Sequence, residues 1–395
     1  MISLVKIYLK GYNVRKKITI KDIAQELNVS VATVSRALNG EKGVNPDLRK
    51  KVVKKAQDMG YFRWSSLQLF NGEPKKIAVI FPENDYFWER VEKGVQDAQE
   101  LLRHFDIDLK VFRTMGHNLS QQNQLLENIM QKEDIDGLAL VPADFTQLDY
   151  FINALYLKGV AVTTFNIDAP LSKRLFYVGQ NSSQAGRVTG KIFASLLKGK
   201  EGKISILTSN KRAPSHMGRW QGLIDFVHKN DMPLDVSQVV EAKDDEESYE
   251  VTRDKLLEEK DLLGIFVSTA FGNIGVGKAL KEKGKKELVV IGNDLGEGWI
   301  PYIKEGIIDC CLFQAPYLQG YLTLVFLAKF LLFEENPPDK NIFLPIIPVF
   351  SENLDGDFLN FERCVTRHAS LTYQFSEIDQ REEFLPSIID YKEVR

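Results

Sequence analysis

Side chains that can bind hydroxyl groups recur along the body of the chain, each placed where a predicted strand ends. Carboxylates, carboxamides and an arginine make directional hydrogen bonds to hydroxyls, and aromatic rings pack on the apolar face of a cyclic polyol. Ligands of open α/β folds bind beyond the carboxyl ends of the strands. We therefore predict one small-molecule site. Its expected members are Asp85, Phe87, Trp88, Asn166, Asp168, Arg219, Thr269, Asp294 and Gln314.

Two groups within this set have a purely structural alternative. The pair Phe87-Trp88 follows a strand, where aromatic residues more often belong to a core. Asp294 and Arg219 have the alternative of a structural ion pair. Neither a metal site nor a cofactor is expected, because no set of histidines, cysteines or carboxylates has the spacing of metal ligands. Surface or capping roles are expected for three histidines, His104, His117 and His228.

A second set of residues can contact nucleic acid. Residues 18–40 predict two short helices joined by a tight turn, because apolar residues recur at helical spacing in both halves. Thr19 and Asp22 have the spacing of a capping box, and Ser30 can cap the second helix. Two such helices form a helix-turn-helix, whose second helix can enter the DNA major groove. An ordinary helical hairpin in a core is the alternative.

The charge distribution favours the DNA-binding interpretation. Residues 14–64 carry 12 Lys+Arg against 5 Asp+Glu, a net charge of +7, whereas residues 65–395 carry a net charge of −12. A third helix is expected after Asn45-Pro46-Asp47. A small basic module on an acidic body is typical of a phosphate-binding domain. The basic residues of the third helix are Arg49, Lys50, Lys51, Lys54 and Lys55.

The stretch T-I-K-D-I-A-Q-E-L-N-V-S-V-A-T-V-S-R-A-L-N-G at residues 19–40 closely resembles the head of the lac repressor family of bacterial transcription regulators. The resemblance implies that Val31, Ala32 and Arg36 choose bases. Val31 and Ala32 offer only apolar contact, for example to thymine methyls, whereas Arg36 can reach guanine or phosphate. It also implies a homodimer on near-palindromic, double-stranded operator DNA. Further DNA contacts are expected from Thr19, Thr33, Ser35 and Asn39, the last three to the DNA backbone.

Residues 63–74 are the expected hinge. In the family this segment becomes a helix on specific DNA, and a leucine wedges between base pairs in the minor groove. Here Arg63-Trp64 stands where the family usually has Pro-Asn, and the wedge position falls on Phe70, with Leu67 nearby. A plain interdomain linker is the alternative.

From residue 75 the pattern changes to alternating strands and helices, which predicts an α/β body with parallel sheets covered on both faces. Two similar series indicate two lobes rather than one wide sheet. Strands are expected at 75–82, 107–113, 137–141 and 160–165, and again at 203–208, 236–241, 263–267 and 287–291. Helices are expected at 87–103, 120–132 and 145–158, and again at 216–230, 246–259 and 273–283.

Short motifs in the body resemble the ribose-type periplasmic sugar-binding fold, which the lac repressor family uses as its effector domain. They are N-I-D-A-P at 166–170, Y-V-G-Q-N at 177–181, I-G-N-D at 291–294 and Q-A-P-Y-L-Q-G-Y at 314–321. The resemblance implies that the predicted site binds a small carbohydrate between two lobes, and that each site residue matches a ligand position of that fold. The chain departs from the fold at Thr269-Ala270, where Asn-Asp is frequent.

These patterns give the expected domain organisation, a small all-α helix-turn-helix head on a two-lobed, periplasmic-binding-protein-like α/β body. The tail after residue 354 matches no family pattern. Crossings between the lobes are expected near residues 166–176, 293–309 and 316–345. In chain order we expect an N-terminal extension at 1–17, the helix-turn-helix domain at 18–62, the hinge at 63–74, the body at 75–354 (lobe 1 at 75–166 plus 310–340, lobe 2 at 176–305) and a tail at 355–395.

Other functional classes have little support. The G-x-x-G-x-G motif at 272–277 reverses the dinucleotide spacing, and no Walker loop, nucleophile elbow or H-E-x-x-H is present, so no catalytic residue is predicted. A nucleotide-binding α/β enzyme and an exported or cytosolic sugar-binding protein are the alternatives. No apolar run approaches the ~20 residues that cross a membrane, and residues 1–12 lack an A-x-A-like cleavage site. We expect a cytoplasmic, nucleoid-associated repressor with reduced cysteines and a carbohydrate effector.

Overall fold

The computed structural model describes residues 19–38, 43–59, 74–83, 86–105, 107–132, 134–143, 148–284 and 288–354. The chain divides into two compact units, one containing the N-terminal head and one containing the body from residue 74. Each unit is described by itself. The predicted hinge residues Leu67 and Phe70, and the predicted tail at 355–395, lie outside the described residues.

The head contains three helices, α2 (Ile20–Leu27), α3 (Val31–Leu38) and α4 (Pro46–Asp58). The predicted capping box is present, since the Thr19 hydroxyl accepts from the Asp22 amide and the Asp22 carboxylate accepts from the Thr19 amide at 2.6 Å. Ser30 caps α3 by accepting from the amide of Thr33 at 3.0 Å. The apolar faces of the three helices meet in one small core. Its buried members are Ile23, Ala24, Val34, Ala37, Leu38, Val52 and Ala56.

The first lobe of the body is built on a parallel six-stranded sheet, sheet A, in the order β11-β5-β4-β3-β1-β2. Central strands of such sheets are buried on both faces, and accordingly six of the nine residues of β1 and all four residues of β3 are buried. The strands are β1 (Lys75–Glu83), β2 (Ile107–Met115), β3 (Gly137–Leu140), β4 (Ala161–Phe165), β5 (Tyr177–Gly179) and β11 (Asn341–Phe343).

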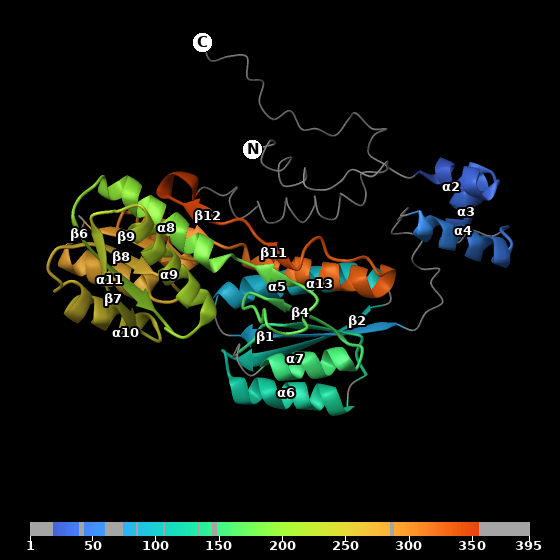
Figure 1. Ribbon diagram of the computed structural model, residues 1–395, viewed down its shortest axis with the longest axis horizontal. Helices are drawn as coiled ribbons and strands as arrows, with labels where there is room; N and C mark the ends of the chain where they lie inside the picture. The colour runs from blue at the N-terminus through green and yellow to red at the C-terminus, as the bar shows by residue number, and fades with distance from the viewer. Residues whose placement is uncertain are drawn as a thin grey trace, which may run out of the picture. The chain divides into compact units, whose positions relative to one another are not determined.

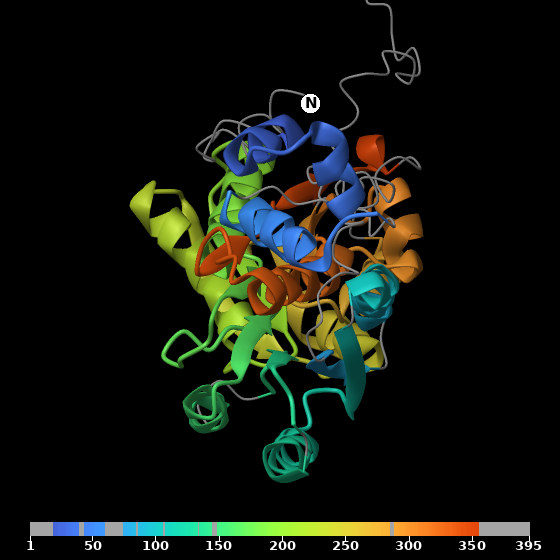
Figure 2. The same ribbon diagram turned by 90° about the vertical axis from the view of Figure 1, so that its right-hand side faces the viewer.

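Two pairs of helices cover sheet A. On one face α6 (Leu119–Lys132) and α7 (Leu148–Leu157) pack on β1 and β3 in one apolar cluster, and Figure 2 shows them end-on in teal and green. On the other face lie α5 (Tyr86–Leu102) and α13 (Pro316–Phe333), as Figure 1 shows. A short 3-10 turn at Arg103–Phe105 follows α5. These two helices approach closely, because a Cβ atom on Gly94 would lie 2.1 Å from the carbonyl oxygen of Tyr317.

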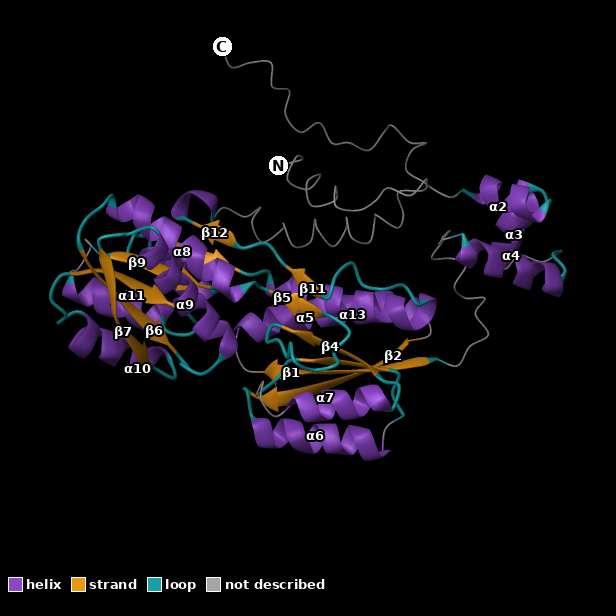
Figure 3. Ribbon diagram, in the orientation of Figure 1, coloured by secondary structure: helices purple, strands orange, loops and turns teal. Residues whose placement is uncertain are grey.

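The second lobe is built on a second six-stranded sheet, sheet B, in the order β12-β10-β9-β8-β6-β7, in which only β12 runs antiparallel. Figure 3 shows its strands in orange among the purple helices. The strands are β6 (Gly202–Thr208), β7 (Leu234–Glu241), β8 (Leu262–Val267), β9 (Val289–Asn293), β10 (Cys310–Phe313) and β12 (Ile347–Val349).

Helices cover both faces of sheet B. α8 and α9 pack on one face through Phe193, Leu223 and Val227. α10 and α11 lie against the other face, where a Cβ on Gly272 would meet Leu207 and Val267. The helical segments of this lobe are α8 (Ser182–Leu197), α9 (Pro214–Lys229), α10 (Asp245–Val251) with a π-helical continuation (Thr252–Leu256), α11 (Asn273–Lys283), a 3-10 turn (Glu297–Trp299), α12 (Ile300–Lys304) and a last 3-10 turn (Ser351–Asn353).

The two-lobed α/β architecture and the order of its strands confirm the predicted fold class. The first two predicted crossings between the lobes are wrong in position, whereas the third predicted range, 316–345, overlaps the observed crossing at its end. The chain crosses between β5 and α8 near residues 180–181, between β10 and α13 at 314–315, and between β11 and β12 at 344–346. Residues 177–179 therefore belong to lobe 1, because β5 pairs with β4, and residues 310–313 belong to lobe 2, because β10 pairs with β9.

Among the described residues, α13 alone is long and apolar enough to cross a membrane. Its mean hydropathy is 1.4, but 72% of the span is buried inside the protein. A helix buried on all sides in a domain is apolar all round for that reason. α13 therefore has the character of a core helix.

The close contact of α5 with α13 gives a stability prediction. We expect Gly94→Ala to lower the free energy of unfolding by roughly 1–3 kcal/mol, because a methyl group must displace the main chain at Tyr317. Urea denaturation followed by circular dichroism measures this. Glu89→Ala, at an exposed position of the same helix, is the control and should change the value by less than about 0.5 kcal/mol. Equal effects of the two substitutions would contradict the packing argument.

Candidate functional site

The exposed side of α3 carries the residues predicted to choose bases. Val31 is 38% exposed, and Ala32 and Arg36 are exposed as well. The opposite side of the helix is buried in the head core. Of the predicted DNA-backbone contacts on this helix, Thr33 and Ser35 are half-buried. This helix thus presents one apolar pair and one cation to its surroundings.

Thr19 and Asn39 are two further residues that are predicted to contact DNA. The Thr19 hydroxyl lies 2.6 Å from the Asp22 carboxylate, so this side chain caps α2. Asn39 lies outside the described residues. On α4, Lys50, Lys51 and Lys54 are exposed, whereas Lys55 forms an ion pair with Glu26 at 2.7 Å. The three exposed lysines are free to meet phosphates.

Arg219 is the most deeply buried cation of the predicted ligand site, at 3% exposure. Its Nε donates to Oε1 of Gln180 at 3.0 Å, and its Nη1 donates to the main-chain oxygen of Ser268 at 2.9 Å. Burial lowers the pKa of Arg219, and the nearby Asp294 carboxylate partly opposes this effect. Two predicted site residues therefore lie close to each other, and the alternative of a structural ion pair applies to the same contact.

Asp294 itself has a left-handed backbone, with φ of 66°. Its amide donates to the main-chain oxygen of Leu312 at 2.8 Å, so the end of β9 is bound to β10. A residue that carries a side chain rarely adopts this backbone conformation unless the surrounding structure enforces it. The strained backbone fixes where this carboxylate lies.

The aromatic pair of the predicted site is mostly buried. Phe87 and Trp88 are 4% and 6% exposed and meet edge to face at 5.0 Å between ring centroids. Their neighbour Tyr86 packs edge to face on Trp299 of the other lobe at 4.9 Å. Packing thus accounts for most of the surface of Phe87 and Trp88. The predicted residue Asp85 lies outside the described residues.

Asn166 of lobe 1 and Gln314 of the second crossing meet at one side chain. Asn166, with φ of 62°, donates from Nδ2 to Oε1 of Gln319 at 3.0 Å. Nε2 of Gln319 donates to the main-chain oxygen of Gln314 at 3.0 Å. The hydroxyl of Tyr177 donates to the main-chain oxygen of Asn166 at 2.9 Å. These bonds bring two predicted ligand residues into one network.

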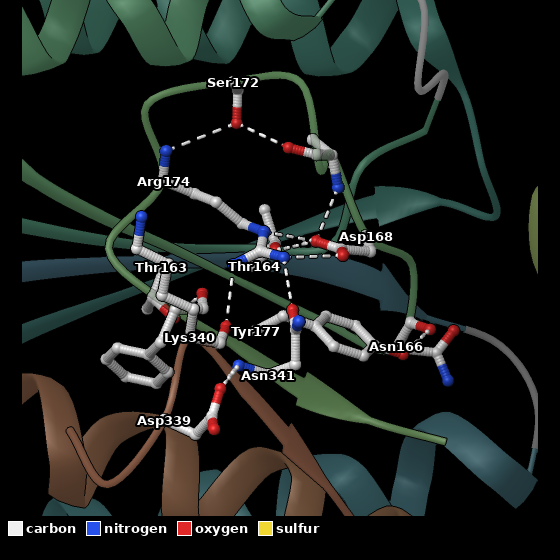
Figure 4. A network of polar contacts seen from close by, with 12 residues as sticks. Thr163, Thr164, Asn166, Asp168, Ser172, Arg174, Tyr177, Asp339, Lys340 and Asn341 are labelled. Carbon is white, nitrogen blue, oxygen red and sulfur yellow. Dashed lines mark hydrogen bonds and ion pairs between the residues drawn. The ribbon is translucent and has the colours of Figure 1, made fainter. Parts of the chain in front are cut away.

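Asp168 is occupied by contacts within lobe 1. Its carboxylate pairs with Nε of Arg174 at 2.5 Å and accepts from Nη2 at 2.8 Å, as Figure 4 shows. The Thr164 hydroxyl donates to the same carboxylate at 3.0 Å. Arg174 also donates to the main-chain oxygen of Lys340 and to Oδ1 of Asn341. Asp168 and Arg174 thereby fasten the loop after β4 to β11, which is a structural role that the sequence did not predict.

Thr269 follows β8 and is 2% exposed. Its hydroxyl lies 3.2 Å from that of Ser209, which follows β6. The two hydroxyls lie beyond the carboxyl ends of neighbouring strands, as expected for the ligand edge of sheet B.

Two histidines lie near this group, and the sequence did not predict either as part of it. The ring of His117 meets Trp88 edge to face at 5.8 Å. Desolvation lowers the pKa of His117 to about 4. Burial, Arg219 and His117 together lower the pKa of His216, on α9, to about 3. Both imidazoles are neutral at pH 7.

Other residues of the site were also missed by the sequence argument, namely Tyr177, Gln180 and Gln319. Tyr177 and Gln180 stand in the motif Y-V-G-Q-N, whose family resemblance predicted the fold but not these contacts. Within the part of the chain that the structure describes, no group of three or more histidine, cysteine or acidic side chains is arranged to hold a metal ion.

Comparison with known proteins gives a family match for each unit. Residues 77–335 match the periplasmic binding protein domain. Residues 19–63 match the lacI family of bacterial regulatory proteins. The first match covers more than half of the chain.

Curated relatives match 70% of the chain. Catabolite control protein A of Priestia megaterium is 25% identical over 285 residues, which is 70% of this chain and 82% of that protein. The ribose operon repressor of Haemophilus influenzae is 25% identical over 283 residues, which is 70% of this chain and 81% of that protein.

Solved structures resemble the body. The glucose-galactose binding protein GanP from Geobacillus stearothermophilus has a TM-score of 0.66 at 22% identity, over 72% of this chain and 100% of that one, and shows the fold. The arabinose-binding protein AraP from the same organism has a TM-score of 0.61 at 26% identity, over 72% of this chain and 99% of that one.

The folds of the head and of the body agree with the two family matches and with the curated relatives. The chain belongs to the periplasmic binding protein domain family through its body, and its head is a regulatory domain of the lacI family.

Proposed function

We propose that this chain is a transcriptional repressor whose affinity for operator DNA is controlled by a small carbohydrate bound between the two lobes. One observation carries the proposal. A helix-turn-helix with an exposed arginine on its second helix is joined in one chain to a two-lobed sugar-binding-protein fold. In that fold a buried arginine of lobe 2 is bonded to Gln180 in the first crossing, and Asn166 of lobe 1 is bonded to Gln319.

The DNA partner follows from the head. Arg36 reads guanine or binds phosphate, and Val31 with Ala32 contact thymine methyls. One helix reads few base pairs, so two heads from a homodimer bind a near-palindromic operator. Leu67 and Phe70 of the hinge are the proposed minor-groove wedge. The protein works in the cytoplasm, on the nucleoid.

The ligand class follows from the body. Arg219, Asp294 and Thr269 supply donors and acceptors from lobe 2, and Asn166 supplies them from lobe 1. The named ligand of AraP, which is 26% identical, is arabinose, and one relative is named a ribose operon repressor. A monosaccharide or a close derivative is therefore the proposed effector, and no catalytic step is proposed for this site.

Control of DNA binding follows from differential affinity. A ligand that touches both lobes binds the closed arrangement more tightly than the open one, and shifts the equilibrium by that difference alone. Two of the three segments that cross between the lobes carry a site residue or the direct partner of one, namely Gln314 and Gln180. Lobe closure therefore changes the geometry at the base of the body, and with it the spacing of the two heads.

Arg36→Ala tests the DNA-binding half of the proposal. We expect operator affinity to fall by ~10–100-fold, because a base-reading arginine contributes about 1–3 kcal/mol, with sugar binding unchanged. Fluorescence anisotropy with operator and scrambled duplexes measures the change. Lys54→Ala, which removes an exposed lysine on α4, is the matched control and should weaken both duplexes alike and reduce the salt slope by about 1. Unchanged operator affinity of Arg36→Ala would refute this role for α3.

Asp294→Asn tests the ligand half. We expect the thermal shift given by the effector sugar to disappear, because the neutral amide no longer accepts two sugar hydroxyls and no longer balances Arg219. Differential scanning fluorimetry across a panel of monosaccharides measures this shift. Asp225→Asn, at an exposed position of α9, should retain the full shift. A retained shift in Asp294→Asn would remove this carboxylate from the site.

A further inference from the structure

Gln319, on α13, is a fully buried glutamine whose carboxamide lies between two predicted ligand residues. Its Nε2 donates to the main-chain oxygen of Gln314 at 3.0 Å and to Oε1 of Gln314 at 3.3 Å. Its Oε1 accepts from Nδ2 of Asn166 at 3.0 Å. Gln319 thus makes a hydrogen bond to one of the two polar atoms in the side-chain amide of Asn166 and to one of the two in that of Gln314.

The direction of these bonds is forced. A main-chain carbonyl oxygen can only accept, so the NH₂ end of Gln319 must face Gln314. The oxygen end of Gln319 then faces Asn166, and Asn166 must present its own NH₂ group to it. By the same rule Gln314 turns its Oε1 toward Gln319. The polarity of both neighbours is therefore set by one main-chain carbonyl group.

The atoms left over are Oδ1 of Asn166 and Nε2 of Gln314. Neither has a hydrogen bond within the described residues, and neither is buried without a partner, so both reach solvent. Asn166 is held from behind, since its main-chain oxygen accepts from the Tyr177 hydroxyl. The amide pair presents one atom that only accepts beside one that only donates.

We propose that Gln319 sets the polarity of the ligand site, so that it selects a neutral ligand with neighbouring hydroxyl groups over acidic ligands. The inference rests on the proposed function, in which Asn166 and Gln314 contact the ligand. One hydroxyl donates to Asn166 while its neighbour accepts from Gln314. A carboxylate or phosphate offers only acceptors, and would place an oxygen against Oδ1 of Asn166. Gln319 is a positioning residue, since it reaches the ligand through its two neighbours.

A double-mutant cycle tests this role. The variants are Gln319→Met, Asn166→Asp and the double variant, and calorimetry measures the dissociation constants of neutral monosaccharides and their uronic acids. Gln319→Met keeps the side-chain length but frees both amides to turn. We expect it to lower the discrimination between neutral sugar and uronic acid by about tenfold, since one net hydrogen bond has that order of effect. A purely structural defect would weaken both ligand classes alike.

Asn166→Asp tests the same bond from its other end and does not depend on the folding of Gln319→Met. A carboxylate can accept a hydrogen bond from a sugar hydroxyl, just as the amide oxygen can. In place of the amide NH₂ group, however, it sets a second acceptor oxygen against Oε1 of Gln319. We expect about tenfold weaker binding of neutral sugar in the wild-type background, and no further loss in the Gln319→Met background. This non-additivity is the signature of a direct coupling. Equal or tighter binding by Asn166→Asp, or additive losses in the cycle, would overturn the proposal.

Gln238→Met is the control variant. Its amide donates to Glu259 and Ser205 within lobe 2, so we expect a lower Tm with an unchanged discrimination ratio. A wild-type protein that prefers uronic acids overturns the polarity argument but leaves carbohydrate control standing. If the wild type binds no member of the panel, and operator binding responds to none, the proposed carbohydrate control itself fails and the inference falls with it.

Discussion

A buried guanidinium group is the constraint on which the body depends. A cation removed from water is tolerated only when hydrogen bonds and an opposite charge compensate it. For Arg219 these come from Gln180 at the first crossing, from the main-chain oxygen of Ser268 after β8, and from the nearby Asp294 after β9. The ends of two strands and one crossing segment are therefore fixed together. Arg219 thereby joins lobe 2 to the first crossing segment.

The crossing segments are bound to one another by side chains rather than by packing alone. Tyr177 donates to Asn166, Gln319 bridges Asn166 and Gln314, and Arg174 joins the loop after β4 to β11. These contacts involve the strands or loops beside all three crossings. In the proposed function, a ligand that binds Asn166 therefore acts on a connected set of hydrogen bonds beside the crossings. A buried polar network of this kind holds one arrangement only when its members are satisfied.

The sequence predicted the series of strands and helices because hydrophobic periodicity is a local property. The caps at Thr19 and Ser30 were predictable for the same reason. The crossings were misplaced because β5 has three residues, and only its pairing with β4 assigns it to lobe 1. Asp168 was predicted as a ligand residue from its type and its position after a strand. In the structure its carboxylate forms an ion pair with Arg174. Gln319 and His216 could not be identified, because their roles depend in part on Asn166 and His117, which are far away in the sequence.

The division between α3 and α4 explains why control of such a regulator can act at a distance. Apolar contacts from Val31 and Ala32 discriminate few base pairs, and the exposed lysines of α4 bind phosphates without regard to sequence. In the proposed repressor, specificity therefore comes from two heads that reach two half-sites at one fixed spacing. A small change in that spacing removes the specific contacts and keeps the phosphate contacts. The head does not need to unfold or rearrange for the operator to be released.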